Sequence, residues 1–325
     1  MMEKKTIIPI ASGKGGVGKS VLAANLAIAL ARMGHTTTAV DLDLGGANLY
    51  SCLGIPNRFP GIGDFMKSGN IKFNDLIIDT KIPNLKFLPG DGKTPFMADI
   101  SFEQRRLLLK KIKSIPSRYV ILDLGAGTVF NTLNFYGLAY KGIIITSFET
   151  SSIMNFIMFL KNFMLRVIVN VAQTNKKALD IMLAAFNQPI SAESLTVGSM
   201  IDKIAKIDPQ LAEHARKMCS LYRPRIVFNM GDHPDELNVL KKLDATIKQG
   251  LSIDADYFGF IFFDEAVRMS ARKRTVLMTS QPYSKAAAGI KTIAERVATK
   301  WDEKLNNSMA ELVKDARGQY EAFKR

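Results

Sequence analysis

The stretch that decides the fold reads Gly13-Lys14-Gly15-Gly16-Val17-Gly18-Lys19-Ser20, which matches the G-x-x-x-x-G-K-[ST] pattern of a phosphate-binding loop. An apolar, strand-like run at residues 6–12 precedes it, and a helical pattern of apolar residues begins at Val21. A strand, a glycine loop and a helix in this order bring backbone N–H groups and the positive end of the helix dipole to one point. We therefore expect residues 13–21 to bind nucleotide phosphates, with Lys19 on the β- and γ-phosphates and Ser20 on Mg²⁺.

The rest of the chain alternates between apolar strand-like runs and helical stretches. The runs predicted as strands are 7–12, 37–41, 85–88, 119–124, 142–147, 225–229 and 257–263. Several are continuously apolar, which is typical of strands covered on both faces. The pattern predicts an α/β fold with a doubly wound, mostly parallel sheet, in which ligands bind at the carboxyl ends of the strands.

Composition narrows the class of protein. A chain of 325 residues with 47% hydrophobic residues can bury a large core, and its net charge of +14 favours anionic partners such as nucleic acid or a phospholipid surface. The alternative is a solvated basic surface without a dedicated partner. The two cysteines lie far apart without a C-x-x-C pair, which argues against a disulfide framework, a zinc site or an iron–sulfur cluster. The same cysteine usage predicts a reduced, cytoplasmic setting. The apolar stretch after Lys5 runs straight into the glycine loop, so we expect no secretory signal peptide.

The extra lysine near the start of the loop, Lys14, makes it resemble the deviant Walker A motif of the MinD/ParA ATPases. In that family the first lysine reaches across a dimer interface to the partner's nucleotide. The resemblance implies that Lys14 acts in trans, as an arginine finger does, on a bound ATP. It covers about residues 5–165 and 222–298.

Two acidic segments follow predicted strands. Asp41-Leu42-Asp43 resembles the family's switch I, which implies that Asp43 positions the attacking water or helps to hold Mg²⁺. Asp41 is then expected to support the Mg²⁺ shell or the local hydrogen bonding. The strand at 119–123 ends in Asp123, the Walker B pattern, which predicts a Mg²⁺ ligand acting through a water. Residues 124–128 resemble switch II of the FlhG/MinD branch.

Further resemblances and departures concern the nucleotide's surroundings. Asn229 ends a strand at the position where family members read the adenine edge. Residues 146–152 resemble the family's Thr-x-x-Glu-x-x-Ser segment beside the dimer interface, and Ser151 or Ser152 is also a plausible helix N-cap. Two departures are Val21, where many relatives carry a hydroxyl, and Phe262, where the family pattern has proline.

We predict a P-loop ATPase domain over residues 1–300, with a helical insertion at about 165–222, and a C-terminal helical tail at 301–325. In the tail, Leu305, Met309, Leu312, Ala316, Tyr320 and Phe323 form a narrow apolar stripe interrupted by acidic residues. A membrane-surface helix has a broad apolar face and a basic opposite face. The stripe therefore favours packing onto the domain, or contact with a partner helix, over binding to a bilayer.

Together the motifs predict an ATP-hydrolysing switch that dimerises with ATP and Mg²⁺, hydrolyses slowly without an activating partner, and positions or regulates a flagellum, pilus or septum site. The alternative is a ParA-like partition ATPase that binds DNA non-specifically through its basic residues. The expected partners are thus a second copy, an activating or target protein, and a DNA or inner-membrane surface. A catalytically dead scaffold and a metabolic phosphotransferase remain as further alternatives.

Overall fold

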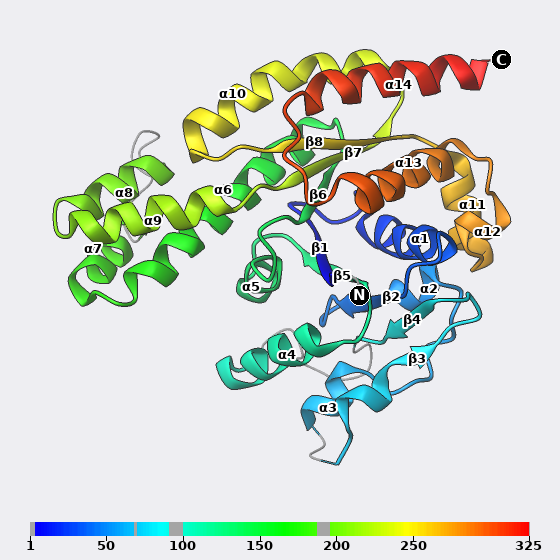
Figure 1. The fold of residues 1–325 in the computed structure, drawn as a ribbon, viewed down its shortest axis with the longest axis horizontal. Helices are drawn as coiled ribbons and strands as arrows, with labels where there is room; N and C mark the ends of the chain where they lie inside the picture. The colour runs from blue at the N-terminus through cyan, green and yellow to red at the C-terminus, as the bar shows by residue number, and fades with distance from the viewer. Residues whose placement is uncertain (1–3, 68–69, 91–99, 187–195, 325) are drawn as a thin grey trace.

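The computed structural model describes residues 4–67, 70–90, 100–186 and 196–324. At its centre is an 8-stranded sheet in the order β3-β4-β2-β5-β1-β6-β7-β8, parallel throughout except for β3, which pairs antiparallel with β4 at one edge (Figure 1). The strands are β1 Thr6–Ser12, β2 Thr37–Leu42, β3 Ile78–Asp79, β4 Leu85–Leu88, β5 Tyr119–Ala126, β6 Ile143–Thr146, β7 Arg225–Gly231 and β8 Asp256–Phe262. The predicted α/β, doubly wound, mostly parallel sheet is confirmed. Only the short antiparallel strand β3 was not predicted.

Helices cover both faces of this sheet. They are α1 Lys19–Arg32, α2 Leu49–Cys52, α3 Ile62–Lys67, α4 Phe102–Ser114, α5 Phe130–Tyr136, α6 Thr150–Ala172, α7 Lys176–Phe186, α8 Val197–Ala205, α9 Pro209–Leu221, α10 Leu240–Leu251, α11 Glu265–Lys273, α12 Leu277–Ser280, α13 Lys285–Lys300 and α14 Ser308–Lys324. Two 3₁₀ turns lie at Phe73–Leu76 (η1) and Pro234–Val239 (η2).

Two hydrophobic clusters form because successive strand residues point to opposite faces. In β5, Val120 and Leu122 join the cluster under α4, α5, α6 and α10, whereas Tyr119 and Ile121 join the cluster under α1 and α13. The central strands are therefore apolar on both faces, which explains their continuous apolar runs.

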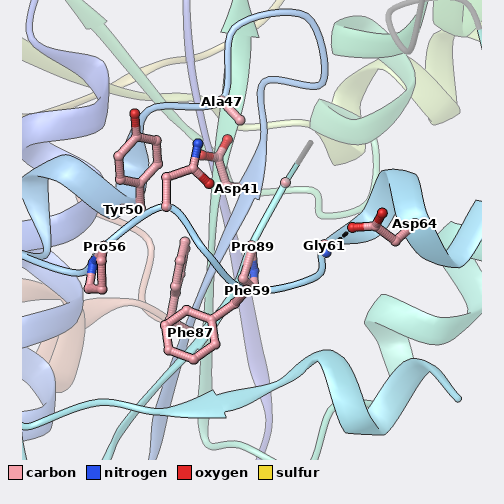
Figure 2. A pocket seen from close by; sticks show the side chains of 11 residues that line it. Asp41, Ala47, Tyr50, Pro56, Phe59, Gly61, Asp64, Phe87 and Pro89 are labelled. Atoms are coloured by element: carbon pink, nitrogen blue, oxygen red, sulfur yellow. Dashed lines mark hydrogen bonds between the residues drawn. The ribbon is translucent and has the colours of Figure 1, made fainter. Parts of the chain in front are cut away.

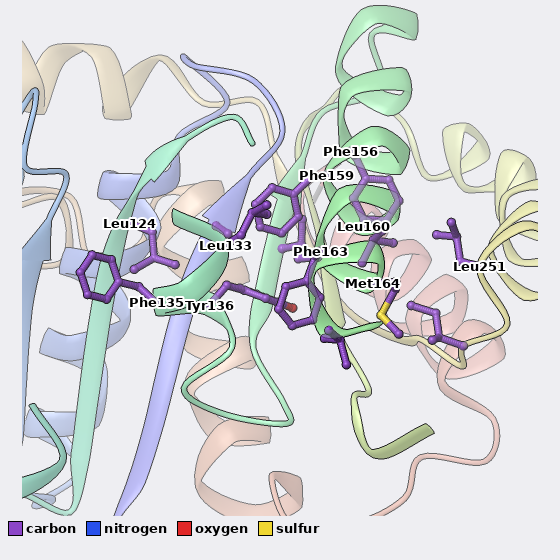
Figure 3. Close-up of a cluster of buried hydrophobic side chains, with 14 of the residues drawn as sticks. Leu124, Leu133, Phe135, Tyr136, Phe156, Phe159, Leu160, Phe163, Met164 and Leu251 are labelled. Carbon is purple, nitrogen blue, oxygen red and sulfur yellow. The ribbon is translucent and has the colours of Figure 1, made fainter. Parts of the chain in front are cut away.

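Helix α6 is the longest apolar segment, long and apolar enough to cross a membrane by length and composition alone. In the fold, half of its most apolar stretch is buried. Figure 3 shows Phe159 and Phe163 of α6 packed toward Tyr136 of α5, and both rings meet that of Tyr136 edge to face. We therefore describe α6 as a core helix. Helices α7–α9 pack around its C-terminal half (Figure 1).

The tail helix α14 packs onto the domain, as the narrow stripe predicted. Leu312 and Ala316 are buried, and Met309, Tyr320 and Phe323 pack against the same cluster. Phe262 at the end of β8 stacks on Tyr320 and meets Phe323 edge to face. Phe262, which stands where the family pattern has proline, is thus part of the surface on which α14 packs.

A buried charge cluster fastens the C-terminal end of α13 to β7 and β8. Arg225 is fully buried and donates to the backbone carbonyls of Lys300, Trp301 and Glu303. Its guanidinium also lies over the rings of Phe258 and Trp301. Asp256, equally buried, accepts a 2.7 Å hydrogen bond from Arg223 and lies 3.6 Å from the Nε of Arg225. Burial lowers the pKa of Arg225 to about 10.

We predict that Asp256→Asn lowers the free energy of unfolding by about 3–5 kcal/mol, because it leaves the buried Arg225 without a counter-charge. Asp254→Asn is the matched control: Asp254 pairs with Arg223 but is 58% exposed. Its loss is expected to cost at most about 1 kcal/mol. Denaturant unfolding of both variants measures the difference, and equal effects would contradict the role given to Asp256.

Candidate nucleotide-binding site

The phosphate-binding loop lies at the carboxyl end of β1 and leads directly into α1. Gly18 caps α1 in a left-handed conformation with φ 90°, and a Cβ there would lie 2.3 Å from the side-chain nitrogen of Asn229. A Cβ on Gly13 would lie 2.1 Å from the backbone oxygen of Asn155 on α6. Glycine is therefore required at both positions, by backbone conformation at Gly18 and by close packing at both. Around Gly15 and Gly16, by contrast, a Cβ would meet no atom within 4 Å, so this part of the loop is exposed.

A buried ion pair joins the loop to the Walker B strand. The Nζ of Lys19 lies 2.9 Å from Oδ1 of Asp123, and the two side chains are 8% and 0% exposed. Burial raises the pKa of Asp123, while Lys19 and Ser20 act in the opposite direction. The other oxygen of Asp123, Oδ2, is buried without a hydrogen-bond partner. An unpartnered carboxylate oxygen beside Ser20 suits a hydrated Mg²⁺, so the residues present fit that ion.

The switch I aspartates reach the same place from the neighbouring strand. Because β2 pairs with β5 in register, Asp41 lies directly opposite Asp123. Asp41 is fully buried and accepts hydrogen bonds from the backbone N–H groups of Asp43 and Leu49. Of its two expected roles, the structure shows the local hydrogen bonding. Burial, followed by repulsion from Asp123, raises the pKa of Asp41 to about 7.

Asp43, at the end of the Asp41-Leu42-Asp43 segment, lies close to the predicted switch II. A Cβ on Gly125 of switch II would lie 3.4 Å from Oδ1 of Asp43, and one on Gly46 would lie 3.5 Å from it. Both are ordinary van der Waals distances, so the backbone at Gly125 and at Gly46 lies close to this carboxylate. Asp43 is therefore a direct neighbour of the switch II backbone.

The second lysine has a different environment from the first. Lys14 donates to Oε2 of Glu149 and to Oγ of Ser151, both at 2.9 Å, and its side chain is 41% exposed. The hydrogen bond and charge of Lys14 lower the pKa of Glu149. Within this chain, Lys14 thus points to the start of α6 and not toward Asp123. The sequence analysis missed this pairing, although the Thr-x-x-Glu-x-x-Ser segment contains both partners.

The expected helix cap at Ser151 or Ser152 is wrong. Helix α6 begins at Thr150 with Glu149 as N-cap residue and no side-chain capping bond, so both serines lie inside the helix. The Ser151 hydroxyl instead accepts from Lys14, and Ser152 is buried. The side chains of Glu149 and Ser151 at this helix start therefore pair with Lys14, and no side chain caps the helix.

Asn229 lies on β7 beside the loop, where its amide nitrogen donates to the backbone oxygen of Val17 at 2.8 Å. Its carbonyl oxygen remains available to a ligand. The side chain of Val21 is half-buried in the first turn of α1 and offers no hydroxyl, as the sequence states. The loop, Lys19, Asp123, Asp41, Asp43 and Asn229 are therefore brought together at one edge of the sheet.

Comparison with known proteins agrees with this geometry. The family model of the CobQ/CobB/MinD/ParA nucleotide binding domain matches residues 8–276. The chain belongs to this family. It is 25% identical to the antiactivator FleN of Pseudomonas aeruginosa over 300 residues, which is 91% of this chain and 87% of FleN. It is also 35% identical to the septum site-determining protein MinD of Synechocystis sp. over 148 residues, covering 45% of this chain and 55% of that MinD.

Solved structures show the same fold. MinD of Pyrococcus horikoshii, solved with Mg-ADP, superposes with a TM-score of 0.57 at 20% identity, covering 92% of this chain and 98% of that chain. The aligned segment spans about half the length of the curated MinD relative and most of FleN. The match to the MinD/ParA nucleotide-binding family confirms the resemblance seen in the sequence.

We predict that the nucleotide-free, metal-free protein loses stability as the pH rises from about 5 to about 7. An acid whose pKa rises from 3.8 to about 7 on folding binds its proton more tightly in the folded state, so the free energy of unfolding falls over this range. The expected loss is about 2 kcal/mol. In Asp41→Asn this part of the slope disappears.

Denaturant unfolding at a series of pH values measures the slope. Asp75→Asn, which changes an exposed carboxyl on η1, is the control and should keep the wild-type slope. Parallel slopes for wild type and Asp41→Asn would show that Asp41 does not titrate in this range.

Proposed function

We propose that this MinD/ParA-family protein is an ATP-dependent dimerisation switch of the FleN/MinD type, which positions or regulates assembly of a cellular structure such as a flagellum, pilus or septum site. The observation that supports the proposal most strongly is that the two lysines of the loop have different environments. Lys19 is buried and paired with Asp123 inside the site, whereas Lys14 is partly exposed and its ammonium group contacts Glu149 and Ser151. An exposed ion pair is worth about 1 kcal/mol or less, so Lys14 can exchange it for phosphate oxygens of a second protomer.

The chain's own residues suggest how hydrolysis proceeds. Lys19 would exchange its contact with Asp123 for the β- and γ-phosphates of ATP. Ser20 and Asp123 would hold Mg²⁺, which would supply positive charge to neutralise the developing negative charge. Asp43 orients the attacking water, and Asn229 offers its amide oxygen to the adenine edge. Lys14 of the partner protomer adds positive charge to the transferring phosphoryl group.

Dimerisation of two ATP-bound protomers would couple ATP hydrolysis to where the protein binds in the cell. Asp43 and Gly125 lie against each other, so loss of the γ-phosphate can change both switches together. The dimer would expose a surface for an activating or target protein while ATP is bound, and hydrolysis would open it again. We propose slow turnover in the absence of that partner.

DNA is the second candidate target. The net charge is +14, and the exposed basic end of α11, Arg272-Lys273-Arg274, offers phosphate contacts. The tail is a poor candidate for membrane attachment, because its apolar stripe is already packed on the domain.

We predict that light scattering coupled to gel filtration finds a dimer with Mg-ATP and a monomer with Mg-ADP. Asp43→Ala should hold the dimer with ATP because water activation is lost. Lys14→Gln should keep nucleotide binding, measured with a fluorescent ADP analogue, but lose the dimer and about 100-fold of the turnover. Lys4→Gln, which removes another exposed ion pair, is the control.

An ATP-independent monomer with steady turnover would overturn the switch and favour a metabolic phosphotransferase. The dimer trapped in Asp43→Ala also decides between targets. Binding to duplex DNA that falls steeply between two salt concentrations would favour the ParA-like alternative. Absence of DNA binding, with capture on anionic liposomes or by a protein partner, would favour the FleN/MinD-like role.

A further inference from the structure

A cavity lies away from the phosphate loop. It has a volume of about 660 Å³ and opens between the C-terminal end of α1, the loop after α2, the β3–β4 hairpin and the α11–α12 turn. Arg32, the last residue of α1, lines it, whereas Lys19 begins the same helix. At 1.5 Å per residue the two helix ends are about 20 Å apart. This cavity is therefore distinct from the nucleotide site, and its volume is in the range of small-molecule sites.

The cavity has an apolar body. Aliphatic and aromatic side chains from three separate segments face it, among them Ile55 and Phe59 after α2, Ile82 in the β3–β4 hairpin, and Val276 before α12. These residues are only partly buried in the folded chain. A ligand with an apolar portion would remove that surface from water.

Its charge is one-sided. Arg32, Arg58, Lys81 and Arg274 line the cavity, against the single carboxylate of Asp79, which already lies 3.3 Å from Lys86. Across the described residues, none of these four basic side chains is within ion-pair distance of a carboxylate. Arg32 is instead fixed by the backbone oxygen of Met278 and the hydroxyl of Thr279, at 2.6 and 2.7 Å, which leaves its charge uncompensated.

From this combination we propose that the cavity binds a small amphiphilic anion, with an apolar body and one carboxylate or phosphate head. The apolar segments receive the body, and the uncompensated guanidinium and ammonium groups attract the head. An inorganic anion would pair with the basic groups but leave the apolar surface of the cavity exposed to water. A neutral lipid would cover the apolar surface but leave the basic groups without a counter-charge.

The cavity is also joined to switch I. Pro56 and Phe59 line it and, in addition, line a small cavity beside Asp41 (Figure 2). The segment that carries them follows α2, whose first N–H is donated to Asp41. A ligand packed on Phe59 would therefore act on the surroundings of Asp41 and Asp43. This coupling, unlike binding itself, rests on the proposed ATP switch.

The test is calorimetric titration of the nucleotide-free, full-length protein with oleate below its micellar concentration. Oleate should bind at one site per chain. Methyl oleate, which keeps the tail without the charge, and inorganic phosphate, which keeps the charge without the tail, should each bind at least about tenfold more weakly. Equal binding of oleate and methyl oleate, or no binding of oleate, would overturn the site.

Charge reversal locates the site. Lys81→Glu with Arg274→Glu should raise the dissociation constant for oleate about tenfold or more, because two rim charges are inverted. Lys72→Glu with Arg272→Glu is the matched control, since both residues are exposed and lie outside the cavity. The Lys81→Arg, Arg274→Lys pair keeps the charge and should keep the affinity. An unchanged constant in the reversed pair would place oleate elsewhere and refute the assignment.

Coupling is measured separately, as ATP turnover with and without saturating oleate. A change of about fivefold, lost in the Lys81→Glu, Arg274→Glu pair, would support it. Unchanged turnover would refute the coupling but leave the binding site standing. If no dimer forms with ATP, the proposed switch is refuted. The oleate titration of the nucleotide-free protein does not depend on that result.

Discussion

The buried ion pair between Lys19 and Asp123 is the interaction on which the site depends. Lys19 begins α1 directly after the glycine loop, and Asp123 lies near the carboxyl end of the neighbouring strand β5, so the pair fixes the loop's exit against the sheet. A buried carboxylate without this lysine would be strongly disfavoured. The pair also keeps the lysine's ammonium group inside the site in the absence of a ligand.

The balance of charge around this pair explains why the site suits a cation as well as a phosphate. The chain as a whole is strongly basic, yet the charge of Asp43 raises the pKa of Asp123, and the charges of Asp123 and Asp43 raise the pKa of Asp41. Burial is the main cause of the raised pKa of Asp41, and repulsion from Asp123 and Asp43 adds to it. A proton on Asp41 relieves the repulsion in the free protein, and a divalent cation would relieve it when nucleotide is bound.

The sequence predicted the site where local chemistry is decisive. The glycine loop, the acids at strand ends and the apolar strands are each specified by residues close in sequence, so the parallel sheet and the meeting of Lys19, Asp41 and Asp123 could be foreseen. The pairing of Lys14 with Glu149 could not, because it joins residues far apart through the packing of Gly13 on α6. The prediction of Ser151 as a helix cap was wrong for the same reason, because its hydroxyl accepts a hydrogen bond from Lys14, which is distant in sequence. Strand β3 was missed because two residues carry no periodic signal.

Phe262 shows how a departure from a family pattern can have a cause outside the site. A proline there would have no aromatic ring to offer, whereas Phe262 stacks on Tyr320 and meets Phe323 of α14. Phe262 at the end of β8 therefore forms part of the surface on which the apolar stripe of α14 packs. Without this surface, the stripe would be exposed to solvent. Releasing α14 would uncover Leu312 and Ala316 and the aromatic contacts at Phe262, at a cost in hydrophobic free energy. A partner that binds the apolar side of α14 must offset this loss of hydrophobic free energy. A partner that binds the exposed, charged side of α14 does not need to displace the helix.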